Sequence, residues 1–141
     1  ARLVDVLNRQ IDAIAELVEQ AEIHAALQPQ LLQKKLGENV SKLISETQIL
    51  DQERLAQEVA LLATKADVTE ELDRLKGHVD AAKELFNKED AIGRALDFLA
   101  QEFFREANTL CSKSLDKQLT RAGLELKSVI EQVREQVKNL E

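Results

Sequence analysis

The sequence predicts an all-α protein, an elongated bundle of about six amphipathic helices with long coiled-coil-like hairpins. Its 141 residues include only 4 Gly and 1 Pro, too few turn residues for a β-sandwich or a barrel. Apolar residues also recur at steps of three and four along most of the chain, which is the period of a helix with one buried face. Each stripe covers one face only, so every helix needs partners.

Residues 1–50 are expected to form a helical hairpin. Pro29 disfavours helix at the residue before it, so a first helix should end there and a second should begin at about Pro29, with Gly37 as a weak point. The first stripe consists of Val4, Leu7, Ile11, Ile14, Val18, Ala21 and Ala25, and the second of Leu31, Leu32, Leu36, Val40, Leu43 and Ile44.

Residues 51–141 are expected to form a second unit of four helices. Asp51 is a suitable cap for the first, and Asp67 with Glu70 has the spacing of a capping box for the next. The last two helices should begin near Ile92 and Ser114. The four stripes are Leu55, Val59 and Leu62; Leu72, Leu75, Val79, Ala82 and Phe86; Ile92, Leu96, Leu99, Phe103, Ala107 and Leu110; Leu119, Ala122, Leu126, Val129, Val133, Val137 and Leu140.

Composition excludes several classes of protein. A net charge of −7 argues against bulk attraction to nucleic acid, although residues 91–141 hold 8 basic and 8 acidic side chains and are neutral. No apolar run approaches the ~20 residues that span a bilayer, and the single cysteine, Cys111, cannot close an internal disulfide. We therefore expect a cytoplasmic protein without a membrane partner. Because the chain contains no Met, we also expect it to be part of a longer protein.

Two rows of polar residues flank the apolar stripes of the fourth and fifth helices. Glu102, Glu106, Thr109 and Lys113 form one row, and Glu71, Arg74 and His78 form the other. Carboxylates and an imidazole at such boundaries can bind a divalent metal. Intrahelical pairing of neighbouring charges explains the same spacing without a function, and spacing alone favours pairing. No phosphate-binding loop, zinc motif or nucleophile elbow is present.

The fifth helix also carries polar residues opposite its stripe: Arg94, Asp97, Gln101, Arg105, Asn108 and Ser112. A solvated face is the simplest explanation. Phe98 and Phe104 lie at its two edges, however, and large rings in such places often mark a contact with another subunit. We therefore predict an oligomer interface that includes Phe98, Gln101, Phe104 and Asn108. Cys111, near the end of this helix, is interpreted as a small buried or boundary residue and not as a nucleophile.

Three stretches resemble the carboxyl-terminal domain of the bacterial YicC/YloC proteins. They are RLAQEVALLATKADVTEELDRLKGHV, GRALDFLAQEFFREANTLCSKSLD and ELKSVIEQVREQVKNLE, and the resemblance runs from about Glu53 to Glu141. The chain departs from the family pattern at Ala100, Phe103, Phe104, Cys111 and Lys138. The resemblance implies a divalent-metal-dependent endoribonuclease of bacterial RNA turnover and stress growth that assembles as a homohexamer, with RNA rather than DNA as its partner and a further amino-terminal domain.

On this resemblance we expect bound Mn²⁺ or Mg²⁺ to assist phosphodiester cleavage. The candidate metal ligands are Glu58, Glu71, Glu102 and Glu106. His78 and Glu102 are the candidate catalytic residues, with His78 as a ligand or a general base. Arg74, Arg94, Arg105 and Lys113 are expected to neutralise RNA phosphates. The alternative is a helical oligomerisation scaffold whose chemistry requires the amino-terminal domain.

Overall fold

The computed structural model describes residues 2–47, 53, 56–61, 67–88 and 91–139, and no strand occurs among them. Residues 56–61 are helical, and the five longer helices are α1 (Arg2–Ala25), α2 (Gln28–Thr47), α4 (Thr69–Phe86), α5 (Gly93–Lys113) and α6 (Lys117–Val137). The prediction of an all-α, elongated bundle is confirmed.

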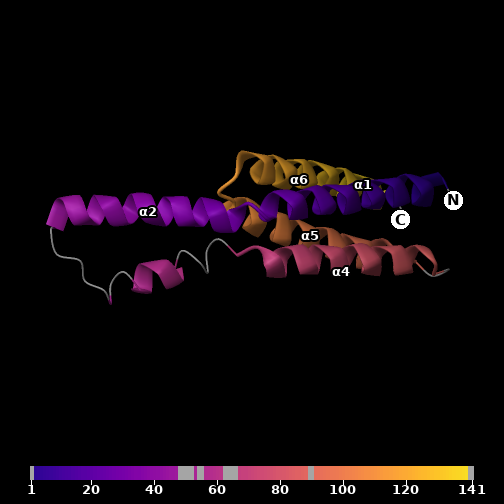
Figure 1. The fold of residues 1–141 in the computed structure, drawn as a ribbon. Coiled ribbons are helices and arrows are strands. Elements are labelled where there is room, and N and C mark those ends of the chain that lie inside the picture. Colours follow the sequence, from indigo (N-terminus) through magenta and orange to yellow (C-terminus); the bar gives the residue numbers. More distant parts are fainter. Residues whose placement is uncertain (1, 48–52, 54–55, 62–66, 89–90, 140–141) are drawn as a thin grey trace.

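Four of these helices form an antiparallel bundle (Figure 1). The order around the bundle is α1, α6, α5, α4, and each helix packs on its two neighbours in that ring. Because α1 and α5 run one way and α4 and α6 the other, each neighbouring pair is antiparallel. This arrangement places α4 directly beside α5, where the two polar rows predicted from the sequence meet.

The apolar stripes explain why these four helices associate. Leu7, Ile11 and Ile14 of α1 are completely buried, as are Leu75 of α4 and Leu110 of α5. Burial of one leucine or isoleucine contributes roughly 1.5–3 kcal/mol, so a continuous core of such residues holds the helices together. The predicted stripe of α6 omitted Ile130, which is also fully buried.

The start of the chain differs from the expected hairpin. Figure 1 shows α2 continuing away from the bundle in nearly the direction of α1. Only Ala26 and Leu27 separate the two helices; the N–H of Ala26 donates to the carbonyl of Glu22 in α1, and the carbonyl of Leu27 accepts from the N–H of Leu31 in α2. Pro29 lies in the first turn of α2, where its missing N–H has no intrahelical partner to lose. The proline therefore interrupts the helix without reversing it.

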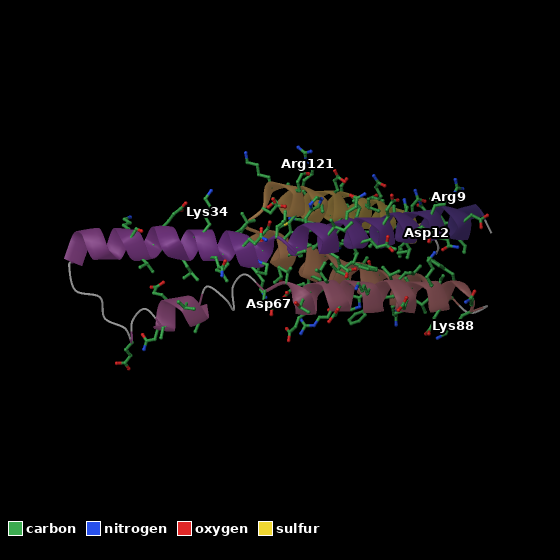
Figure 2. The ribbon with its side chains drawn as sticks, viewed as in Figure 1. Arg9, Asp12, Lys34, Asp67, Lys88 and Arg121 are labelled. Carbon is green, nitrogen blue, oxygen red and sulfur yellow. The ribbon has the colours of Figure 1, made fainter. Side chains whose placement is uncertain are left out.

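As a result α1 packs on α6 and α4, and α2 projects as an arm. No described side chain between residues 29 and 42 is buried, and charged side chains such as Lys34 point away from the bundle (Figure 2). None of the described helices is long and apolar enough to cross a membrane.

The observed helix starts refine the predicted caps. Asp67 lies one residue before the N-cap position of α4, which is Val68, and its carboxylate accepts a hydrogen bond from the N–H of Thr69 at 3.0 Å. Glu70 does not complete a capping box, because it pairs with Arg74. The last helix starts later than expected, with Asp116 as a cap that accepts from the N–H of Leu119.

Candidate functional site

The polar rows of α4 and α5 face each other along one side of the contact between these helices. Glu71, Arg74 and His78 share a flank of α4, and Glu102, Glu106 and Lys113 share a flank of α5. Because the helices are antiparallel, residues early in α4 meet residues late in α5. Three cross-helix contacts result, and each has a different character.

The first contact is a buried ion pair. Glu71 is 3% exposed, and both of its carboxylate oxygens accept hydrogen bonds from Lys113 Nζ, at 3.2 and 3.0 Å. The same ammonium group donates to the carbonyl of Asp67 at 3.0 Å. A buried carboxylate is tolerated only with such compensation. The structure therefore places Glu71 and Lys113 in a pair with each other.

The second contact joins Arg74 to two carboxylates. Its guanidinium lies 3.4 Å from Glu70 on the same helix and 3.7 Å from Glu106 across the interface. The Glu106 side chain is buried, whereas half of the Arg74 side chain is exposed. At 3.7 Å the Glu106 carboxylate receives charge compensation without a hydrogen bond. It therefore retains oxygen lone pairs for another partner.

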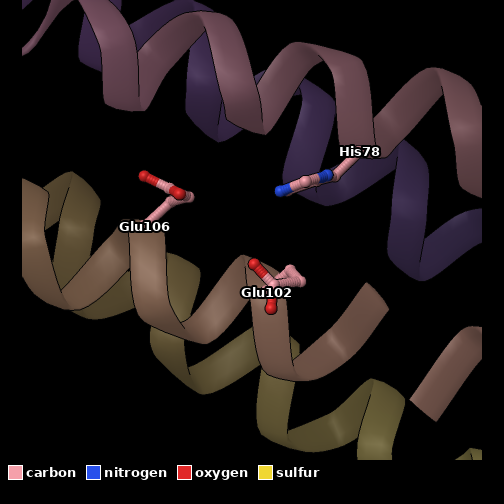
Figure 3. Close-up of side chains that lie close together, drawn as sticks. All are labelled: His78, Glu102 and Glu106. Atoms are coloured by element: carbon pink, nitrogen blue, oxygen red, sulfur yellow. The ribbon is translucent and has the colours of Figure 1, made fainter. Parts of the chain in front are cut away.

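The third contact is a cluster of His78, Glu102 and Glu106. One ligand atom from each of these residues lies within 4.8 Å of the others. Figure 3 shows the imidazole of α4 pointing toward the two carboxylates of α5. His78 Nε2 is buried and has no hydrogen-bond partner among the described residues. A buried polar atom without a partner costs about 1–3 kcal/mol, so a ligand here would remove an existing penalty.

Packing beneath the cluster fixes the imidazole. The ring of Phe103, which is 1% exposed, meets the His78 ring edge to face, with centroids 5.6 Å apart. Phe103 was predicted only as a core residue, because its place in the apolar stripe of α5 does not reveal which side chain of α4 it meets. A rigid imidazole with two carboxylates opposite matches the mixed nitrogen and oxygen ligands that first-row divalent metals accept.

The remaining predicted ligand and phosphate-binding residues lie outside this cluster. Glu58 is exposed on the helical segment 56–61, which Figure 1 places beyond the end of the bundle. Arg94 and Arg105 are exposed on α5, and neither forms an ion pair with a described residue. The chain thus brings together His78, Glu102 and Glu106 but not Glu58.

The residues predicted at an oligomer interface differ in exposure. Phe98 is 60% exposed, whereas Phe104 is half-buried beneath Lys127 of α6, whose Nζ lies 5.3 Å from the ring centroid. Gln101 donates to Asp97 on its own helix at 3.1 Å, and Asn108 is exposed. Phe104 therefore has a partner within the chain, and Phe98 is the most open large apolar side chain of this helix.

Sequence reasoning missed Gln28, which lies at the break between α1 and α2. Its side chain is 4% exposed; it donates to the carbonyl of Lys113 at 3.1 Å and accepts from the N–H of Leu115 at 2.8 Å. These bonds hold the connection between α5 and α6 beside the Glu71 and Lys113 pair. The only sign of this role in the sequence is that the polar residue Gln28 directly precedes Pro29, and this arrangement is common in ordinary loops.

Comparison with known proteins assigns the chain to a family. Residues 19–141 match the family described as "Endoribonuclease YicC-like, C-terminal". The chain is 39% identical over 140 residues to the probable endoribonuclease YicC of Clostridioides difficile (strain 630), and 43% identical over 141 residues to that of Haemophilus influenzae (strain ATCC 51907 / DSM 11121 / KW20 / Rd). Each match covers 99% of the chain and 48% of the relative, so the chain spans about half of their length. The expected resemblance is confirmed, and the chain belongs to the endoribonuclease YicC-like family.

Proposed function

We propose that this chain carries the metal site of a divalent-metal-dependent endoribonuclease. RNA as the substrate class follows from the relatives, which are named probable endoribonucleases. The observation that carries the metal site is the buried, unpartnered Nε2 of His78, which faces the carboxylates of Glu102 and Glu106.

The donor set favours Mn²⁺ over Mg²⁺. Mg²⁺ prefers oxygen ligands in a strict octahedron, whereas Mn²⁺ accepts an imidazole nitrogen more readily. Either ion, when bound, would supply a Lewis acid that polarises a phosphoryl oxygen or lowers the pKa of a bound water. Two carboxylates would leave a divalent ion without net charge, and further coordination positions would remain for water and phosphate.

The protein's own residues would prepare this chemistry. Phe103 holds the His78 ring, and Arg74 holds the buried Glu106 carboxylate while exposing half of its own side chain. A guanidinium at that distance from the ligands can also reach a phosphate oxygen. Glu71 and Lys113 would have a structural role and hold α4 against α5, because both carboxylate oxygens of Glu71 already accept hydrogen bonds from Lys113.

The proposal is tested by incubating single-stranded RNA with the chain in Mn²⁺, in Mg²⁺ and in EDTA. We expect cleavage that is faster in Mn²⁺ than in Mg²⁺ and absent in EDTA. Loss of a catalytic metal ligand should lower the rate at least 100-fold, in line with the several kcal/mol that a bound metal supplies. His78→Ala, Glu102→Gln and Glu106→Gln should therefore be inactive.

Matched controls separate the site from general effects of charge or stability. His24→Ala and Glu131→Gln change the same residue types on α1 and α6, and both variants should cleave normally. Cleavage that persists in EDTA, or in all three site variants, would contradict the proposal. Normal folding with no cleavage by the unmodified chain would favour the scaffold alternative, in which the amino-terminal domain supplies the chemistry.

We also propose that the chain assembles into a homo-oligomer through α2. The arm makes no extended contact with another described element. Leu32, Leu36 and Val40 nevertheless follow one another at steps of four along one face of α2. With Leu31 beside them, they are the half-buried residues of the described part of this helix. An apolar helix face in water is a typical interaction surface, and the hexamer implied by the family resemblance would cover it.

A further inference from the structure

A groove lies between the end of α4 and the beginning of α5, and its lining residues follow His78 on α4 and precede Glu102 on α5 in the sequence. It is open, has a volume of about 610 Å³, and is lined by residues at the end of α4 and the beginning of α5. Lys88, labelled in Figure 2 at the end of α4 opposite Asp67, lies on its rim. Phe98 and Arg94 line its α5 side. The groove therefore combines an aromatic ring with two cations.

Phe98 is placed to receive a flat ligand. Its side chain is 60% exposed, and its neighbours in the groove include Ala81, Ala91 and Ala95, whose small side chains leave space beside the ring. An exposed aromatic ring is costly in water, whereas stacking of a nucleobase on it is favourable by roughly 1–3 kcal/mol per base.

The position of Phe98 along α5 links it to the candidate metal site. Phe98 precedes Glu102 by one helical turn, a rise of about 6 Å. On α5, Arg94, Phe98 and Arg105 lie within about 40° of one another around the helix, and the Cα atoms of Arg94 and Arg105 are separated by a rise of about 16 Å. A nucleic-acid strand in this groove would therefore meet Arg94 and the Phe98 ring about one helical turn before Glu102, and Arg105 lies beyond the groove lining on the same side of α5 as Phe98.

Charge in the groove favours an anionic occupant over a second copy of this acidic chain. Arg94 and Lys88 form no ion pair with a described residue, and Glu84 is the acidic residue among those that line the groove. Cations that have no ion-pair partner among the described residues, beside an exposed aromatic ring, are the components of sites for single-stranded nucleic acid.

We infer that Phe98, between Arg94 and Arg105, is a nucleobase-stacking subsite that positions single-stranded RNA across the His78, Glu102 and Glu106 cluster. This inference rests on the proposed function for the identity of the ligand as RNA. Phe98 would then bind substrate, whereas its place at the edge of the polar face of α5 had suggested a subunit contact. Stacking tolerates any base, so the subsite would impose little sequence preference.

The test measures binding of a fluorescein-labelled single-stranded RNA by fluorescence anisotropy, in EDTA so that no cleavage accompanies binding. Phe98→Ala should weaken binding roughly 5- to 150-fold, the equivalent of one lost stack. Phe98→Trp should bind as well as the unmodified chain, and Phe98→Leu should bind as weakly as Phe98→Ala, because leucine keeps the apolar contact and lacks the ring. Leu124→Ala, an exposed apolar residue of α6, is the matched control and should have no effect.

Two further readouts decide between stacking and a subunit contact. RNA that contains 2-aminopurine should change in fluorescence on binding to the unmodified chain and not to Phe98→Ala, because that base responds to stacking. Light scattering should give the same mass for both chains. Equal RNA affinity of the alanine and phenylalanine forms, or a smaller assembly for Phe98→Ala, would overturn the inference.

Measured together, RNA binding and RNA cleavage test the stacking subsite and the proposed nuclease activity separately. Cleavage in Mn²⁺ with unchanged binding by Phe98→Ala rejects the stacking subsite and leaves the nuclease intact. RNA binding that depends on Phe98 without any cleavage rejects the nuclease and supports the subsite. A chain that neither binds nor cleaves RNA contradicts both.

Discussion

At the level of single residues, Cys111 of α5 packs directly against Gly123 of α6. A Cβ atom on Gly123 would lie 2.5 Å from Cys111 Sγ, which is far inside the van der Waals limit. Helix α5 continues to Lys113, so Cys111 faces α6 from within the helix and not from the following turn. The sequence predicted a small buried or boundary residue at Cys111, and the side chain is half-buried. Its partner could not be predicted, because periodicity identifies the face of a helix but not the neighbour that covers this face.

Gly123→Ala should therefore destabilise the protein by about 1–3 kcal/mol through overpacking. In the Cys111→Ala background the same change should cost little, since the next atom, the carbonyl oxygen of Ala107, would be 3.9 Å from the new Cβ. Urea unfolding of the two single variants and the double variant measures this coupling. Additive effects would contradict the account.

Gly77→Ala is the matched control for the Gly123→Ala variant. Gly77 is exposed in the middle of α4, and a Cβ there would meet nothing within 4 Å. Alanine should stabilise the helix by about 0.5–1 kcal/mol, because glycine loses more backbone entropy on folding. Burial also raises the pKa of the Cys111 thiol, so this cysteine should react slowly with thiol reagents while the protein is folded.

At the scale of elements, the sequence predicted the existence and buried faces of α1, α4, α5 and α6 because each stripe is long and regular. Helix ends were less accurate, as the starts of α4 and α6 depend on which side chain actually reaches the free N–H groups. The expected hairpin of residues 1–50 differs from the structure for a related reason. A proline marks a break in hydrogen bonding but does not determine the direction of the next helix.

The start of α4 has a predicted pH dependence. Hydrogen bonds from Thr69, the backbone N–H first, lower the pKa of Asp67 below its ordinary value. The stabilisation is therefore present above about pH 4, where the unfolded chain's aspartate is ionised, and is lost as pH falls through the lower folded pKa. Asp67→Ala should reduce stability at neutral pH by roughly 0.5–1 kcal/mol, the value of an exposed helix cap.

Thermal unfolding at pH 7 and at about pH 2.5 measures this effect. The difference between Asp67→Ala and the unmodified chain should be clear at pH 7 and should nearly vanish in acid. Asp80→Ala, which removes another exposed carboxylate of α4, should not show that pattern. An equal loss at both pH values would indicate that Asp67 acts by something other than its ionised carboxylate.

At the scale of the whole molecule, the bundle determines which predicted site residues meet. The polar rows on α4 and α5 could be predicted from spacing, since three- and four-residue steps place side chains on a common flank. Their register could not, because it depends on how far α4 slides along α5. That register pairs Glu71 with Lys113 and leaves His78 opposite Glu102 and Glu106.

The projecting arm carries a prediction of its own. If α2 holds copies of the chain together, Leu36→Asp should lower the mass measured by light scattering, because a charge cannot be buried in an apolar interface without a partner. Gln33→Asp adds the same charge at an exposed position of α2 and should leave the mass unchanged. Equal masses for all three chains would assign assembly to another surface.

Anomalous X-ray diffraction from crystals of the chain grown with Mn²⁺ shows whether His78, Glu102 and Glu106 bind one metal ion. We expect an anomalous peak between α4 and α5, about 2.0–2.3 Å from His78 Nε2 and from one oxygen of each carboxylate. The peak should disappear in Glu106→Gln crystals. A well-ordered cluster without a peak, or Mn²⁺ bound only elsewhere, would contradict the proposed metal site.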